Sequence, residues 1–377
     1  MCPPGVDQTT RSPPLWTFLA PGLSQKQELP SDRKERWYDA GPLGFFNSGL
    51  SWDAFGKLAR VGHDSKSPFL LRQLVRAPDM SSRLEKLAAE LLCIISADLD
   101  VDDLIALGLC SQTLWCIAMC QLQNEYQRRM APWAGTPIIC TSTHLTSVPD
   151  SFRQVNPGLI EEMEAWKVRG QMGTRPRMGM SPVRRWNWRA LNDYSEVVDV
   201  HSLSSQCLAA FSTKVESSGI PKKLQASLQR TMTNDLFHPP SVHNRSKWVL
   251  RNLDTKEVVH FRAVKREGFK DTVCLAISGL PWLTLDFVLT LRILWPNLNQ
   301  YNDPQPSNVK VGAWAGHKFD VVEAANFEPG ESWQNATEDI VREAKTTKPN
   351  SKSLWWIMYA YVKWAAGLEG CLVGLAM

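Results

Sequence analysis

Side chains able to perform acid–base or nucleophilic chemistry are scattered along this chain and form no cluster. Of the seven histidines, His317 lies three residues before Asp320. A histidine–carboxylate pair needs a nucleophile to activate, and the chain has no nucleophile motif, phosphate-binding glycine loop or dinucleotide fingerprint. We therefore interpret His317 and Asp320 as structural polar groups. The sequence predicts no catalytic residue, no cofactor and no enzymatic activity.

The nine cysteines form an odd, dispersed set without a CxxC pair. Cys116 and Cys120 are one helical turn apart, but no nearby histidine completes a four-ligand zinc site. We therefore expect no metal. Unpaired thiols suit a reducing compartment, and Pro3 and Asp7 interrupt any secretory signal. The expected location is cytoplasmic, nuclear or both.

Residues 169–189 are rich in arginine and end with Trp186 and Trp188 interleaved among arginines. Such a segment can hold phosphates and stack on bases, so nucleic-acid binding is one interpretation. The whole chain has a net charge of only +4, which gives no general support to a nucleic-acid partner. We favour a basic loop that leads into an amphipathic helix. The same residue types anchor protein interfaces, and the candidate target-binding residues are Arg184, Arg185, Trp186, Trp188 and Arg189.

Helical periodicity becomes clear from residue 82 onward. Ser82 and Glu85 match a capping box, and apolar residues then recur at helical spacing up to Ile95. A second helix fits residues 102–110 and a third fits 111–126. Three short helices bury too little surface to be stable alone. The first has apolar residues on both faces, so either the rest of the chain or a partner protein must cover it.

Residues 87–115 read LAAELLCIISADLDVDDLIALGLCSQTLW and resemble an F-box, the adaptor-binding motif of ubiquitin-ligase substrate receptors. Ala88 replaces the usual proline, so the first helix is expected to start earlier, at Ser82. Ser96 stands where a bulky apolar residue is common and should reduce the apolar contact surface. The resemblance implies that a Skp-family adaptor contacts Leu87, Glu90, Leu91, Leu92, Ile95, Leu99, Leu104, Leu107 and Trp115.

Three later pieces, at residues 131–149, 248–259 and 312–322, resemble in the same order a group of fungal F-box proteins with a β-rich C-terminal region. The expected fold class is α+β. A small three-helix F-box-like unit at residues 81–130 is followed by a mixed, β-rich domain with flanking helices at residues 131–345.

Strands are predicted at residues 138–141, 283–294 and 309–322, and a hairpin at 248–261 around a turn at 252–256. Further helices are predicted near residues 159–168, 182–194, 202–213, 222–232 and 332–345.

Tryptophan is unusually frequent, with 16 residues, and we interpret most of them as core fillers. The tripeptide Trp-Ala-Gly occurs twice, each time ahead of an apolar strand. We expect equivalent strand entrances at which glycine lets the backbone approach closely. Trp133 and Trp314 are expected to be buried.

The two ends of the chain differ in composition. Residues 1–80 are rich in proline, glycine, serine and charge, which predicts a disordered segment. Residues 346–377 form an apolar tail, of which 354–377 is long enough to span a bilayer. Lys363 and Glu369 are costly at mid-bilayer depth. We therefore expect a docked or interfacial helix and no membrane span.

The resemblance implies a noncatalytic substrate receptor of a Skp–cullin–F-box type ubiquitin ligase. Residues 83–130 would bind the adaptor and, through it, a cullin scaffold. Residues 131–345 would hold a target protein near the ubiquitin-charged enzyme, which raises its effective concentration there. An F-box protein that acts outside the ligase as a scaffold is the alternative. Nucleic-acid binding through residues 169–189 is the alternative from another class.

Overall fold

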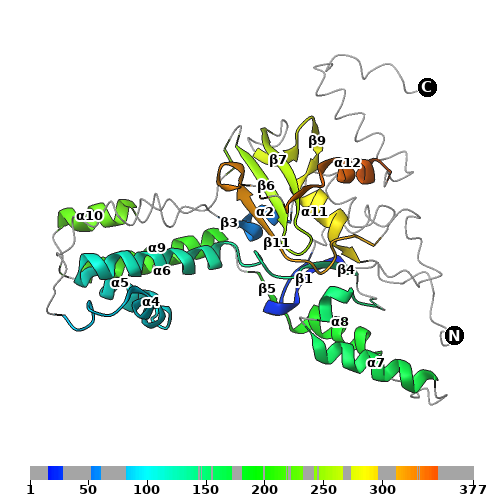
Figure 1. Cartoon of the computed structure of the whole chain (residues 1–377), viewed down its shortest axis with the longest axis horizontal. Coiled ribbons are helices and arrows are strands. Elements are labelled where there is room, and N and C mark those ends of the chain that lie inside the picture. Colours follow the sequence, from blue (N-terminus) through cyan, green and yellow to red (C-terminus); the bar gives the residue numbers. More distant parts are fainter. Residues whose placement is uncertain are drawn as a thin grey trace, which may run out of the picture.

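The computed structural model consists of an arm of helices that projects from a pair of β-sheets (Figure 1). Both sheets are mixed, with parallel and antiparallel strand pairs. The predicted mixture of helices and strands is therefore correct. The structure describes residues 16–28, 52–60, 82–142, 145, 147–153, 156–171, 181–197, 200–217, 219, 222–231, 242–243, 246–265, 273–295, 311–328, 330 and 332–346. The apolar tail lies outside these residues, as does part of the basic segment.

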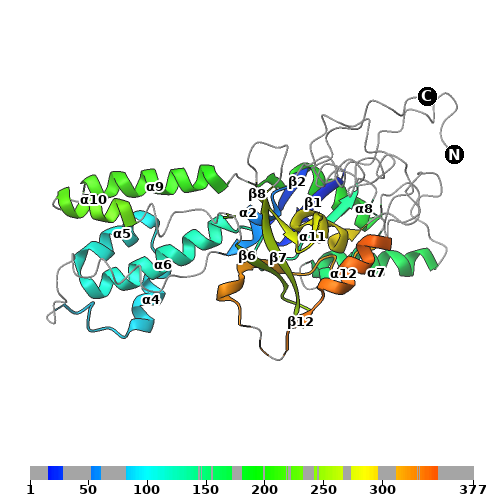
Figure 2. The same ribbon diagram turned by 90° about the horizontal axis from the view of Figure 1, so that it is seen from above.

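Five of the described helices form the arm, seen from above in Figure 2. They are α4 (Ala89–Ala97), α5 (Val101–Cys110), α6 (Gln112–Met130), α9 (Val200–Ser217) and α10 (Lys222–Thr231). The expected start of the first helix at Ser82 is wrong. Ser82 Oγ accepts a hydrogen bond from the amide of Glu85 at 3.4 Å, but the chain there forms a turn, and the helix begins at Ala89.

The core of the arm combines early and late parts of the chain. Trp115 of α6 is fully buried there together with Leu104 of α5 and Phe211 of α9. The sequence predicted a helical unit at residues 81–130 and a separate unit at 131–345. This division is wrong for α9 and α10, because both helices belong to the arm. Three short helices bury too little apolar surface alone, and the two later helices supply more.

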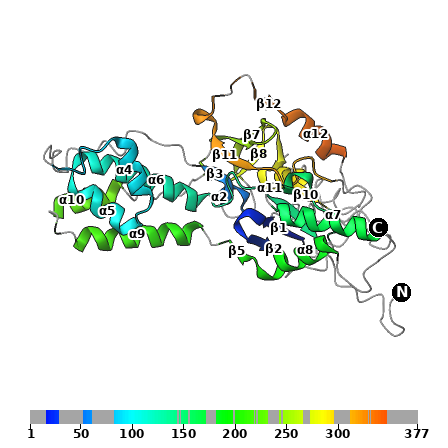
Figure 3. The same cartoon turned by 60° about the horizontal axis from the view of Figure 1, so that its bottom comes forward.

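The first sheet has the strand order β10-β4-β1-β2-β5. Its strands are β1 (Trp16–Ala20), β2 (Gln25–Glu28), β4 (Ile139–Ser142), β5 (Ser195–Glu196) and β10 (Leu294–Trp295). The helices that follow β4 are η5 (Asp150–Arg153), α7 (Pro157–Gln171) and α8 (Pro182–Asp193). Figure 3 shows β1, β2 and α8 together below the second sheet.

The second sheet has the order β3-β11-β6-β7-β8-β9, and β12 pairs with β7. Its strands are β3 (Ala59–Arg60), β6 (Lys247–Asn252), β7 (Glu257–Lys265), β8 (Val273–Ile277), β9 (Leu280–Thr284), β11 (Phe319–Glu323) and β12 (Gln334–Asn335). The remaining helices are η2 (Pro21–Leu23), α2 (Ala54–Leu58), α11 (Leu285–Ile293), η7 (Ala324–Asn326) and α12 (Thr337–Thr346). The predicted hairpin is confirmed as β6 and β7.

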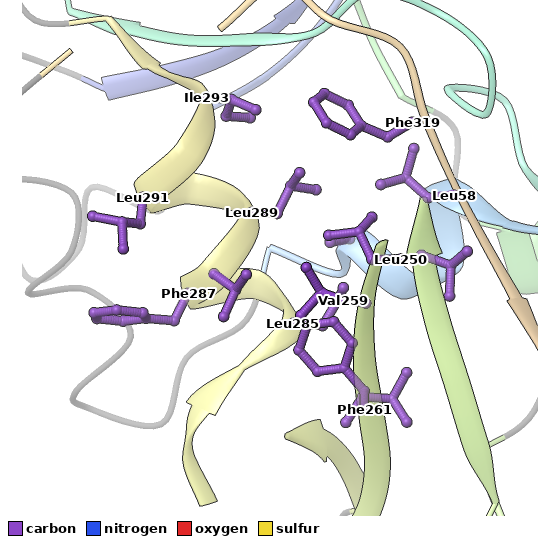
Figure 4. Packing of buried hydrophobic residues seen from close by; sticks show 14 of the residues in the cluster. Leu58, Leu250, Val259, Phe261, Leu285, Phe287, Leu289, Leu291, Ile293 and Phe319 are labelled. Carbon is purple, nitrogen blue, oxygen red and sulfur yellow. The ribbon is translucent and has the colours of Figure 1, made fainter. Parts of the chain in front are cut away.

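The largest hydrophobic core brings α2 and α11 against the inner face of the second sheet. Figure 4 shows Leu58 of α2 and Leu289 of α11 near Leu250, Val259 and Phe319 of the strands. The two tryptophans predicted to be buried are both found in this core.

Part of the segment predicted to be disordered is ordered and buried. Phe18 and Leu19 of β1 are fully buried, as are Trp52 and Leu58 at α2. The expectation of disorder over residues 1–80 is therefore wrong at 16–28 and 52–60. These elements are only a few residues long, so their apolar pattern was too short to stand out from the polar sequence around it.

The apolar run predicted as a strand at residues 283–294 is mainly the helix α11. Thr284 caps this helix, because its Oγ1 accepts a hydrogen bond from the amide of Phe287 at 3.3 Å. A short run that is apolar on all sides fits a buried strand or a buried helix equally well. Because α11 is buried on nearly every side, its sequence lacks the polar face that would have distinguished a helix from a strand.

The two sheets repeat one plan. Each contains an antiparallel hairpin whose connection ends in a residue with positive φ, Ser24 at 51° and Lys256 at 57°. In both, a short parallel strand then adds to the second hairpin strand. The amide of Ser195 donates to the carbonyl of Ser24 at 3.1 Å, and that of Gln334 donates to the carbonyl of Lys256 at 2.9 Å.

The two Trp-Ala-Gly turns are equivalent in the same way. Gly135 and Gly316 have φ values of 77° and 78°. The amide of Gly135 donates to the carbonyl of Phe319 at 2.7 Å, and the amide of Gly316 donates to the carbonyl of Ile138 at 2.8 Å. Each acceptor lies three residues after the other glycine, so the two bonds are reciprocal. The prediction of equivalent strand entrances is confirmed.

The part of the chain that forms each hairpin also contributes a helix and a short strand to the sheet of the other part. The first part contributes α2 and β3, and the second contributes α11 and β10. The amide of Trp133 donates to the carbonyl of Lys57 in α2, and that of Trp314 donates to the carbonyl of Arg292 in α11. The strand after α2, β3, pairs in parallel with β11 of the second sheet. The strand after α11, β10, pairs in parallel with β4 of the first. This exchange ties the two sheets together.

We predict that Gly316→Ala lowers the free energy of unfolding more than Gly279→Ala does. Both glycines have φ of 78°, so an added Cβ strains the backbone similarly at the two sites. At Gly316 the Cβ would also overlap Ser151 Oγ and approach Phe152 ring carbons at 3.0 Å, whereas nothing lies within 4 Å at Gly279. Urea unfolding should show an additional loss of about 1–3 kcal/mol. Equal losses would contradict the tight packing of the turn.

Candidate docking surfaces

An exposed apolar stripe runs along α4 and the turn before it. Leu87, Leu91, Ile94 and Ile95 are 36%, 49%, 64% and 42% exposed. The spacing of Leu91, Ile94 and Ile95 places them on one face of the helix, and Leu87 lies just before its start. The other face packs against the arm through the buried Leu92. The helix therefore cannot turn its stripe inward without exposing that buried contact.

Ser96 lies on the buried side of α4 rather than in the stripe. Its side chain is fully buried, and its Oγ donates a hydrogen bond to the carbonyl of Cys93 at 3.0 Å. The expectation that Ser96 reduces the contact surface is therefore wrong, because this residue faces the arm.

The residues predicted to bind an adaptor divide into three sets. The exposed set is Leu87, Glu90, Leu91 and Ile95. Leu99 and Leu107 are half-buried. Leu92, Leu104 and Trp115 are buried in the arm, so assigning them to a surface was wrong. Ile94, the most exposed member of the stripe, was not among the predicted residues, although its position three residues after Leu91 places it on the same face.

An uncovered stripe of this kind is unusual, because monomeric proteins seldom expose a contiguous apolar patch without a function. Covering it would gain roughly 25 cal/mol for each Å² of apolar surface removed from water. The stripe has the properties of a docking surface and offers no group that could act in chemistry.

The basic and aromatic surface lies on α8, on the first sheet. Ser181 caps the helix by accepting a hydrogen bond from the amide of Arg184 at 3.3 Å, and proline follows it at the first helical position. Val183 and Ala190 are buried in one cluster with Leu19 and Ile139 of the sheet. This anchoring fixes which face of α8 points outward.

The structure separates the two tryptophans of α8. Trp186 is half-buried, and its ring meets the ring of Phe152 edge to face at 5.5 Å. Trp188 points outward and is 56% exposed. The arginines of the predicted target-binding set, Arg184, Arg185 and Arg189, are all exposed. Four of the five predicted residues therefore share the outer surface, whereas Trp186 packs partly buried against Phe152.

His317 and Asp320 each bond to other groups. His317 Nδ1 lies 3.0 Å from Asn252 Nδ2, and burial lowers the pKa of His317. Asp320 is fully buried, and its two carboxylate oxygens accept hydrogen bonds from Arg251 at 2.8 and 2.7 Å. Arg60 approaches the same carboxylate at 3.4 Å. The Asp320 contacts join β3, β6 and β11, and the His317 contact joins the turn before β11 to β6.

Within the described ranges, no three histidine, cysteine, aspartate or glutamate residues come together as a metal site. Burial raises the pKa of the Cys140 thiol, which keeps it protonated. In the same part of the chain, no helix is long and apolar enough to cross a membrane. No protein-family model, curated protein or solved structure matches the chain significantly.

We predict that His317 makes stability depend on pH. Because the pKa of folded His317 lies below its ordinary value near 6.5, the unfolded chain binds its proton first. Stability is therefore kept above about pH 6.5 and lost as the pH falls below it. Urea midpoints at pH 7.5 and pH 5.5 should differ less in His317→Gln than in the unchanged protein. The same pH dependence in both would exclude this contribution.

Proposed function

We propose that this chain is a noncatalytic substrate receptor of a Skp–cullin–F-box type ubiquitin ligase. The observation that carries the proposal is the exposed stripe on α4, formed by Leu87, Leu91, Ile94 and Ile95. The stripe lies within residues 87–115, whose sequence resembles the adaptor-binding motif. An adaptor that covered this stripe would remove from water the apolar side chains that the arm leaves uncovered.

The direct connection between the arm and the sheets supports this role. Met130 ends α6, and both it and Ala131 are buried. Trp133 then enters the core at once, with its amide bonded to the carbonyl of Lys57 at 3.1 Å. The arm is therefore joined to the sheets without a flexible linker at this point (Figure 2). A target held on the sheets would keep a defined position relative to the adaptor, which favours transfer to nearby lysines.

Two helices from later in the chain also belong to the arm. α9 and α10 lie between β5 and β6 in the chain order, and their Phe211 and Leu228 pack in the core of the arm. This shared core holds the arm helices together as one unit. A unit of this kind suits a receptor that positions a target and also a scaffold that binds the adaptor outside the ligase.

We predict that Leu91→Asp combined with Ile95→Asp weakens adaptor binding by at least about tenfold, or 1.4 kcal/mol. Both side chains are exposed, so the charges enter the proposed contact without entering the arm's core. Leu99 is unsuitable for this test because it packs against that core. Binding to a purified Skp-family adaptor is measured by titration calorimetry, and circular dichroism verifies the fold.

The matched control is Leu23→Asp combined with Val168→Asp. These side chains are 41% and 48% exposed and lie outside the arm, so adaptor binding should be retained. Undiminished binding by the α4 variant would contradict the assigned surface. Capture of a cullin together with the adaptor separates a ligase receptor from a scaffold acting outside the ligase.

A further inference from the structure

We infer that the outer face of α8 binds an acidic segment of a target protein, with Trp188 as its apolar anchor. This inference rests on the proposed function and names the chemistry of the target. Four outward side chains of one helix carry it: Arg184, Arg185, Trp188 and Arg189.

The exposure of Trp188 has no counterpart among the other described tryptophans. It is 56% exposed, whereas no other tryptophan within the described ranges is among the exposed large apolar residues. Its neighbour Trp186 contacts Phe152 and so contributes to the fold. Trp188 is therefore the residue of α8 that is available to a partner. Tryptophan is among the residues most often found at the energetic centre of an interface.

The charges around Trp188 are largely unneutralised. Arg185 lies 3.9 Å from a carboxylate oxygen of Glu162 on α7, a distant and exposed pair. Arg184 and Arg189 have no carboxylate within ion-pair distance in the described part of the chain. Exposed guanidinium groups bind carboxylates by paired hydrogen bonds. The complementary partner is a segment that carries aspartate or glutamate on both sides of an apolar side chain.

The size of the face fits a short segment. α8 contains 12 residues, which corresponds to about 18 Å along the helix axis. Beside it, α7 exposes Glu161, Glu162 and Glu164. A nucleic-acid strand carries a charge at every phosphate and would extend from the arginines onto these carboxylates. A short acidic segment can place its charges over the arginines alone, and for this reason we favour a protein partner.

The test is a selection of short random peptides displayed on phage against the immobilised full-length chain. The unchanged protein should enrich peptides with several aspartate or glutamate residues around an aromatic or aliphatic one. The variant Arg184→Glu, Arg185→Glu, Arg189→Glu should lose this enrichment. Trp188→Ala should weaken binding of an enriched peptide, measured by fluorescence anisotropy, by about tenfold or more.

A charge-matched control uses α10 of the arm, where Lys222, Lys223 and Arg230 are all exposed. Their replacement by glutamate makes the same change in net charge and should leave the enrichment intact. Enrichment without an acidic bias, or equal loss in the control, would overturn the inference. Tighter binding of a single-stranded RNA of scrambled sequence that depends on the same three arginines would also overturn it, in favour of nucleic acid.

The α8 variants should bind the purified Skp-family adaptor as the unchanged protein does, because α8 lies on the first sheet and α4 lies in the arm (Figure 1). Adaptor binding with no acidic-peptide binding would refute this inference alone. Failure of the α4 stripe to bind the adaptor would refute the proposed function and leave the peptide result interpretable.

Discussion

Two reciprocal backbone hydrogen bonds link the two sheets of this protein at their strand entrances. Gly135 and Gly316 donate to the carbonyls of Phe319 and Ile138, each glycine reaching into the strand entrance of the other half. Both glycines have positive φ, and an added Cβ would meet Arg60 at Gly135, and Ser151 and Phe152 at Gly316. Both turns therefore need glycine for its positive φ, and the turn at Gly316 also needs it for space. The tryptophans of the same two turns also bond to the exchanged helices, Trp133 to Lys57 of α2 and Trp314 to Arg292 of α11.

The two sheets differ in the character of an outward-facing residue pair, which in the first sheet lies where α8 packs. In the first sheet Leu19 faces Ile139, whereas in the second Arg251 faces Asp320 at the equivalent register. The apolar pair must be covered, and α8 packs against it. The charged pair needs no such cover, because Arg251 donates hydrogen bonds to Asp320. The Arg251 guanidinium also lies over the Trp333 ring at 5.6 Å. The first sheet thereby gains a helix that presents arginine and tryptophan outward.

The sequence revealed elements with long or strongly patterned signals and missed those that depend on distant contacts. The turn around Asn252, the paired Trp-Ala-Gly entrances and most of the helices were predictable from local chemistry. β1 and α2 were not, because their few residues become stable only against strands far along the chain. The stripe on α4 was predicted in part, since spacing identifies Leu91 and Ile95 but cannot show that Trp115 is buried by Phe211 of α9.

Function in this account follows from one helix that buries one face in the arm and leaves an apolar face open. We propose that a Skp-family adaptor covers this open face, on the basis of the resemblance of its sequence to an F-box. Hydrogen–deuterium exchange of the full-length chain, with and without the purified adaptor, tests this most directly. The account predicts slower amide exchange across Ala89–Ala97 and unchanged exchange in α8. No protection of α4 at saturating adaptor, or protection confined to the sheets, would contradict it.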